Sequence, residues 1–164
     1  MNELTLSSSV VQPPASVAST ATTTMTFDTL GFDFALVNVL LGTFTTTDPT
    51  LTTLKFKESD DTVLTNFAAI TALTGGTAGN TSSNFVIPIA AVTGLGGAIQ
   101  FQIDLRKRKR YLKLNATPGT TQVIAAICEL GRAEQASITA AQKSLPLNNP
   151  GASAAVGCMT VVQI

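Results

Sequence analysis

The sequence predicts an all-β protein, an antiparallel β-sandwich of jelly-roll-like type with extended N- and C-terminal arms. Short segments alternate apolar and polar residues with the period of two that is typical of strands. Turns rich in Gly and Pro separate these segments at spacings of about ten residues. Only 12% of the 164 residues are charged, whereas soluble domains carry about 25%. We therefore expect other subunits to cover much of this surface; a rigid extracellular β-protein is the alternative.

Composition divides the chain into three regions. Residues 1–26 are low in complexity, and Pro13, Pro14 and the Ser/Thr clusters favour an extended N-terminal arm over a helix. Residues 27–132 hold the alternating segments of the predicted β-sandwich domain. Residues 133–164 are a C-terminal tail or arm, and its last stretch, CMTVVQI, predicts a strand that docks onto the domain or pairs with a neighbour.

The first strands of the domain are predicted from residues 32–57. The stretch FDFALVNVLLGTF is apolar on both parities, which indicates a central strand. Asp48-Pro49 then predicts a turn, because Pro cannot donate to a β-ladder. In LTTLKFKESDD, Leu54 and Phe56 alternate with lysines, which indicates a half-buried strand.

The middle of the domain is less regular. TVLTNFAAITAL combines helical spacing of apolar residues with Thr and Asn, so we expect an irregular segment or one short turn. Residues 74–84 are a glycine-rich loop that lacks the Lys-Ser or Lys-Thr pair of a phosphate-binding loop. FVIPIAAV contains Pro88, which restricts it to an edge strand or a bulged strand.

The last segments alternate most clearly. AIQFQIDL, RYLKLNAT and QVIAAICELG are predicted core strands, with a turn at Pro118-Gly119 and an end at Gly131. The residues of the first two that we expect to face inward are Ile99, Phe101, Ile103, Leu105, Leu112, Leu114 and Ala116.

A basic run, RKRKR, lies between two of these strands. The inward positions are odd-numbered before the run and even-numbered after it, so a turn or bulge falls near Arg108. We therefore expect the cations at a hairpin tip or strand bend. The candidate protein-interface residues are Arg106, Lys107, Arg108, Lys109, Arg110 and Tyr111.

Contact with another protein is the favoured role of this run. The chain has a net charge of zero, whereas nucleic-acid-binding domains are usually basic overall. Tyr111 is the single aromatic residue nearby, so the stacking platform of a single-strand binder is missing. Nonspecific contact with phosphates and a plain solvated loop are the alternatives. Arginine forks pair well with carboxylates of a partner, so nucleic acid is disfavoured.

Common catalytic and metal sites are not predicted. The chain has no histidine, which excludes Ser-His-Asp and Cys-His nucleophilic arrangements. Cys128 and Cys158 lack CxxC spacing; Cys128 is expected to be a buried thiol, and a disulfide between the two is disfavoured. Glu58, Asp60 and Asp61 could serve as calcium ligands, but a solvated turn is favoured. We expect no enzyme activity and no cofactor.

The order of these segments resembles small structural proteins of tailed bacteriophages. Six segments carry the resemblance over residues 27–135. In chain order they are TLGFDFALVNVLLG, TLKFKESDDT, the glycine loop, FVIP, FQIDLRKRKRYLKLNATPGTT and ELGRAEQ. In those proteins a strand reading Asp-x-Arg-x-x-x-Arg-Tyr-Leu-Lys-Leu precedes a Pro-Gly-Thr turn. The pattern falls here on Asp104, Arg106, Arg110, Tyr111, Leu112, Lys113, Leu114, Pro118, Gly119 and Thr120.

The resemblance implies a non-enzymatic capsid decoration (cement) protein on the capsid surface of a virion. Such proteins form homo-oligomers, trimers more often than dimers, and staple neighbouring subunits of the major capsid protein. The chain lacks a secretory signal and a long apolar span, so we expect assembly in the host cytoplasm and no membrane partner. Another virion component (a tail, head–tail or fibre protein) is the alternative. A carbohydrate- or nucleic-acid-binding module is less favoured, because the chain has no Trp and one Tyr.

Overall fold

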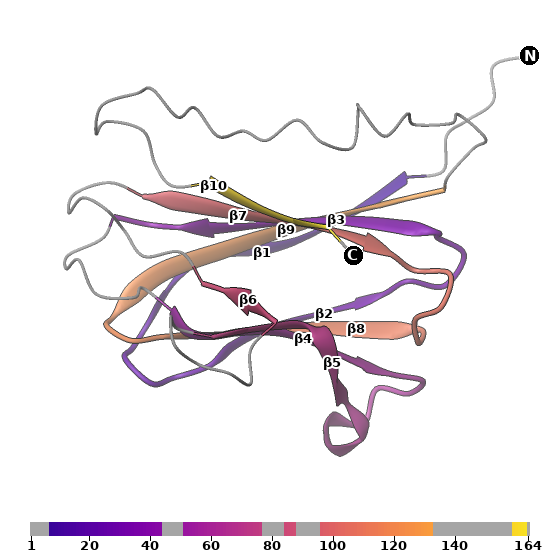
Figure 1. The fold of residues 1–164 in the computed structure, drawn as a ribbon, viewed down its shortest axis with the longest axis horizontal. Coiled ribbons are helices and arrows are strands. Elements are labelled where there is room, and N and C mark those ends of the chain that lie inside the picture. The colour runs from indigo at the N-terminus through magenta and orange to yellow at the C-terminus, as the bar shows by residue number, and fades with distance from the viewer. Residues whose placement is uncertain (1–6, 44–50, 77–83, 88–95, 133–158, 164) are drawn as a thin grey trace, which may run out of the picture.

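Two β-sheets pack face to face and form nearly all of the folded chain (Figure 1). A computed structural model describes residues 7–43, 51–76, 84–87, 96–132 and 159–163. The helical part of these ranges is one 3-10 turn, η1 (Leu64–Asn66). No helix within them is long and apolar enough to span a membrane. The predicted β-sandwich is therefore confirmed.

Each sheet has five strands among the described residues. Sheet A runs in the order β1 (Ser7–Val17), β9 (Gln122–Gly131), β3 (Phe34–Leu41), β7 (Gly97–Asp104) and β10 (Met159–Gln163). Sheet B runs in the order β2 (Thr23–Asp28), β8 (Tyr111–Pro118), β4 (Leu51–Ser59), β5 (Ala68–Gly76) and β6 (Phe85–Val86). Neighbouring strands are antiparallel, except that β10 is parallel to β7 and β6 is parallel to β5.

The strand order is that of a jelly roll. Four antiparallel pairs, β1–β9, β2–β8, β3–β7 and β4–β5, follow one another along the chain. The first and third pairs lie in sheet A, and the second and fourth lie in sheet B. The chain therefore forms one long antiparallel hairpin that winds around the core. A hairpin of eight strands wound in this way gives the two Greek keys of a jelly roll. The short strands β6 and β10 add to its edges.

The N-terminal segment belongs to the sandwich, so the arm expected over residues 1–26 is wrong from Ser7 onward. β1 pairs with β9 from Ser7 to Val17, and β2 pairs with β8. β1 lies at the edge of sheet A, where most of its side chains are exposed and a register shift accommodates Pro13 and Pro14. The Ser, Thr and Pro residues of this segment do not alternate regularly with apolar residues, so the sequence did not predict a strand. The pairing with β9 holds the segment in place.

The domain limits change accordingly. The boundary expected between residues 26 and 27 falls inside β2, so the sandwich begins with β1. At the other end, the predicted terminal strand is confirmed as β10, which docks on β7 of the same chain. Residues 1–6 and 133–158, with the rest of the predicted arms, lie outside the described ranges.

Three aromatic rings join the two sheets across the core. The ring of Phe101 on β7 lies 4.9 Å from that of Phe56 on β4 and 5.6 Å from that of Phe85 on β6. Gly75 leaves room for the third ring, because a Cβ at that position would lie 2.4 Å from two of its carbons. The seven residues predicted to face inward from Ile99 to Ala116 are all buried.

The other strands match the sequence predictions with one exception. β3 lies between β9 and β7, as expected for a strand that is apolar on both faces, and β6 lies at the edge of sheet B. β4 buries Leu54 and Phe56. β5 was not predicted: η1 supplies the expected short turn, but a strand with an irregular register follows it, so that Ile70 and Leu73 both face inward. The turn expected at Asp48-Pro49 lies outside the described residues.

Replacing Phe101 by Ala should lower the free energy of unfolding by about 3–5 kcal/mol, because it empties a site enclosed by both sheets. Urea denaturation of the full chain measures this loss. Phe34→Ala, in the neighbouring strand, is the matched control, since its side chain is 38% exposed. We expect the control to lose less than about 1 kcal/mol. Equal losses in the two variants would contradict the placement of Phe101 in the core.

Candidate functional site

The basic run connects the two sheets. β7 ends at Asp104 in sheet A, and β8 begins at Tyr111 in sheet B. The predicted turn near Arg108 is confirmed, but it is a crossing between sheets and not a hairpin tip. The connection changes the inward parity from odd-numbered residues in β7 to even-numbered residues in β8. Backbone hydrogen bonds fix the crossing, from Leu105 N to Asp33 O at 2.9 Å and from Arg108 N to Leu105 O at 2.9 Å.

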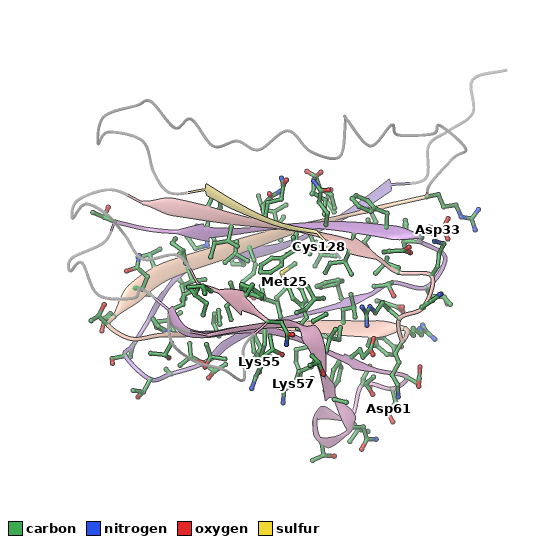
Figure 2. All side chains as sticks on the ribbon, viewed as in Figure 1. Met25, Asp33, Lys55, Lys57, Asp61 and Cys128 are labelled. Carbon is green, nitrogen blue, oxygen red and sulfur yellow. The ribbon has the colours of Figure 1, made fainter. Side chains whose placement is uncertain are left out.

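Charged residues gather around this crossing. It lies at the same end of the sandwich as the β2–β3 connection, the β4–β5 connection and the end of β9 (Figures 1 and 2). We call this region the charged end. Its acidic and basic residues, equal in number, are Asp28, Asp33, Glu58, Asp60, Asp61, Asp104, Arg106, Lys107, Arg108, Lys109, Arg110 and Arg132.

Arg110 ties the crossing to the β2–β3 connection. Its guanidinium makes a two-pronged ion pair with Asp28, with Nε 3.0 Å from Oδ1 and Nη2 2.6 Å from Oδ2. Thr29 donates to the carbonyl of Arg110 from its backbone N–H at 2.8 Å and from its hydroxyl at 2.7 Å. The hydrogen bonds from Arg110 hold the pKa of the Asp28 carboxyl below its ordinary value. The guanidinium also lies 4.9 Å from the centre of the Tyr111 ring.

Arg106 pairs with an acid of its own turn. Its Nε lies 2.9 Å from Asp104 Oδ1, and its backbone N–H donates to the same oxygen at 3.0 Å. The hydrogen bonds from Arg106 lower the pKa of Asp104 from 3.8 to about 2. This pair shapes the turn locally, whereas the Arg110–Asp28 pair joins two connections.

Lys109 is the third cation of the basic run with an acidic partner, which lies in the β4–β5 connection. Its Nζ lies 3.0 Å from Asp60 Oδ2, and its backbone N–H donates to Glu58 Oε2 at 3.2 Å. The acids that could have bound calcium are therefore engaged within the chain. Asp61 accepts hydrogen bonds from the backbone of Val63 at 2.9 Å and from Asn66 Nδ2 at 2.7 Å. These hydrogen bonds form the turn that the sequence predicted at Ser59, Asp60 and Asp61, and no group of three His, Cys, Asp or Glu side chains is placed to hold a metal ion in the part of the chain that the structure describes.

The structure thus divides the predicted interface residues into two groups. Arg106, Lys109 and Arg110 each have an acidic partner in the same chain. No ion pair forms at Lys107 or Arg108 among the described residues. The run is therefore less cationic toward solvent than its sequence indicated, and any charge presented to a partner comes mainly from these two side chains.

A second group of cations was missed by the sequence analysis. Lys113 on β8 is only 6% exposed, and its Nζ lies 4.0 Å above the centre of the Phe67 ring, which follows η1. In the register of sheet B, Lys113 stands directly opposite Lys57 on β4. Desolvation, and then the charge of Lys57, lowers the pKa of Lys113. Alternation indicated that each lysine faces outward, but only the pairing of β4 with β8 brings them together.

Cys128 has no role in a site on the surface. Its side chain is fully buried in β9, which confirms the predicted buried thiol. Burial raises the pKa of the thiol to about 12, so the nucleophilic thiolate does not form near neutral pH. Cys158 lies outside the described residues.

Acid should weaken the fold through the carboxylates of the charged end. The pKa of Asp104 in the folded protein, about 2, lies below its ordinary value of 3.8, and the pKa of Asp28 is also lowered. The stabilisation is therefore fully present above 3.8 and is lost as the pH falls through about 2. Urea denaturation over this range should show a declining free energy of unfolding. Asp28→Asn should be less stable near neutral pH and decline less steeply; parallel curves would contradict the role of Asp28.

Comparisons with known proteins give a distant structural neighbour. The chain matches no family model and no curated protein. A solved 4-O-methyl-alpha-glucuronidase with specificity for decorated arabinogalactans is 11% identical, with a TM-score of 0.38. The match covers 82% of this chain and 18% of that enzyme. A likeness this weak carries no inference about activity, because unrelated functions share such folds.

Proposed function

We propose that this protein is a non-enzymatic structural component of a tailed-phage virion, a capsid decoration protein that binds the major capsid protein and stabilises the head. It acts as a homo-oligomer, with a trimer favoured over a dimer, on the capsid surface. The resemblance of residues 27–135 to phage structural proteins suggested this role. The surface of the sandwich supports it, because its features suit contact between proteins.

One observation carries the proposal: the outer face of sheet A exposes large apolar side chains. Leu40 on β3 is 41% exposed and lies opposite the apolar Ala125 of β9, while Val11 on β1 is 60% exposed and lies opposite Ile127. Exposed apolar patches of this kind mark protein–protein contacts. We call this surface the apolar face; its exposed members are Val11, Phe34, Leu40 and Val123.

The β1 edge of sheet A favours contact through this face over strand addition at that edge. β1 carries Pro13 and Pro14 at its register shift, and these residues have no backbone N–H to donate to an incoming strand. A second copy or a capsid subunit therefore meets side chains of the apolar face and not the hydrogen-bonding edge of β1. Apolar burial contributes about 25 cal/mol per Å² to such a contact.

The charged end fits the same role. Its acids neutralise three of the five cations of the basic run, which leaves a weak electrostatic footprint for nucleic acid. Lys107 and Arg108 remain for carboxylates of the shell. The same surfaces would suit a tail, head–tail or fibre protein, so the test must locate the protein on the particle.

The test combines sedimentation of the purified chain with binding to expanded capsids. We expect an oligomer that binds the capsids. The double variant Val11→Asp and Val123→Asp should be monomeric, bind weakly and keep the wild-type melting temperature, because both side chains are exposed. Val63→Asp is the matched control, since Val63 is 53% exposed but lies at the charged end. A wild-type chain that stays monomeric and does not bind capsids would refute the proposal.

A further inference from the structure

Three lysines form a row on the outer face of sheet B. Lys55 and Lys57 alternate with the buried Leu54 and Phe56 of β4, so they face away from the core, as Figure 2 shows. Lys57 lies directly opposite Lys113 in the central strand pair of the sheet. We call Lys55, Lys57 and Lys113 the lysine row.

No acid of the described residues pairs with this row. Like charges directly opposite each other on paired strands repel, and the sheet nevertheless places Lys57 against Lys113. The acids nearest in β4 and β2 are bonded elsewhere: Glu58 accepts from the backbone of Lys109, and Asp28 pairs with Arg110. No ion pair forms at the row within the described ranges. Acids and cations are equal in number at the charged end, so the uncompensated charge is a local property of the outer face of sheet B.

Asn115 adds an unsatisfied polar atom beside the row. It lies opposite Lys55 in the pairing of β4 with β8, and opposite Thr24 in the pairing with β2. Its Oδ1 is enclosed and accepts no hydrogen bond from the described residues. A buried acceptor without a donor is costly, and it adds an unfavourable polar atom beside three positive charges.

We propose that the lysine row binds an acidic segment of a partner protein. The carboxylates of that segment pair with Lys55 and Lys57, and Lys113, which is only 6% exposed and lies opposite Lys57, adds its positive charge to the same surface. Lys55 and Lys57 are two residues apart on one face of β4, which is the spacing at which an extended protein segment presents alternate carboxylates, whereas inorganic phosphate is one compact anion. Phe67, the aromatic ring at the row, is buried under Lys113, so bases have no exposed ring on which to stack.

This surface is separate from the contacts of the proposed function. The apolar face belongs to sheet A, and the basic run belongs to the charged end, whereas the lysine row lies on the outside of sheet B. The inference therefore goes beyond capsid decoration and does not depend on it. Acidic-peptide binding by a chain that fails to bind capsids would refute the proposed function alone.

The experiment measures binding of a fluorescent hexaglutamate peptide to the full chain at low salt by anisotropy, with hexaglutamine as the uncharged peptide control. We expect hexaglutamate to bind, hexaglutamine not to bind, and about 0.15 M salt to weaken the interaction. The double variant Lys55→Gln and Lys57→Gln should bind about tenfold more weakly, because each exposed ion pair contributes a few-fold. The matched control, Lys107→Gln with Arg108→Gln, loses the same charge at the charged end and should bind as the wild type does.

Further arms make each outcome decisive. Lys113→Met keeps the packing on Phe67, and we expect it to melt like the wild type but to bind the peptide several-fold more weakly. Equal weakening by the two double variants would mean that net charge alone acts, and would overturn the inference. Failure of the wild type to bind hexaglutamate would also overturn it. An oligothymidylate or inorganic phosphate that binds the row more tightly than hexaglutamate would assign the row to nucleic acid or to free anions instead of protein.

Discussion

The pairing of β1 with β9 is the contact on which the rest of the sandwich depends. It joins the first described strand to the last strand of the wound hairpin. Without it, β9 would become the edge of sheet A, and its apolar residues would lose a neighbour on one side. β1 has little to stabilise it by itself, because most of its side chains are exposed and Pro13 and Pro14 interrupt its ladder. The strand exists because its backbone completes the ladder of β9, which the remaining strands hold in place.

The path of the eight-strand hairpin also determines where the charged and apolar side chains lie on the surface. The chain crosses from one sheet to the other between β7 and β8. Three cations of that crossing form ion pairs: Arg106 with Asp104, Lys109 with Asp60 and Arg110 with Asp28. The outer face of sheet A exposes the four side chains of the apolar face, and that of sheet B carries the lysine row. One small domain thus presents three chemically different surfaces, an arrangement that suits a protein whose work is contact.

The sequence predicted the core strands well because their residues alternate strictly. Ile99, Phe101 and Ile103 are buried as expected, and the change of parity located the turn near Arg108. β1 and β5 were missed for a physical reason: an exposed edge strand interrupted by two prolines and a strand of irregular register carry little alternation. Within the site, neither the acidic partners of the basic run nor the neighbours in the lysine row could be predicted. Asp28 lies 82 residues from Arg110, and only strand pairing brings such residues together.

Amide hydrogen exchange in β1 tests the central claim most directly. If β1 closes the jelly roll, those amides of Ser7–Val17 that are bonded to β9 exchange slowly, and their protection is lost in the same cooperative step as that of β9. Pro13 and Pro14 carry no amide proton, so the hydrogen-bonded positions on either side of them report the pairing. Exchange of β1 at the rate of an unfolded chain, while β9 stays protected, would contradict the claim. The segment would then be an arm on a sandwich that closes without it.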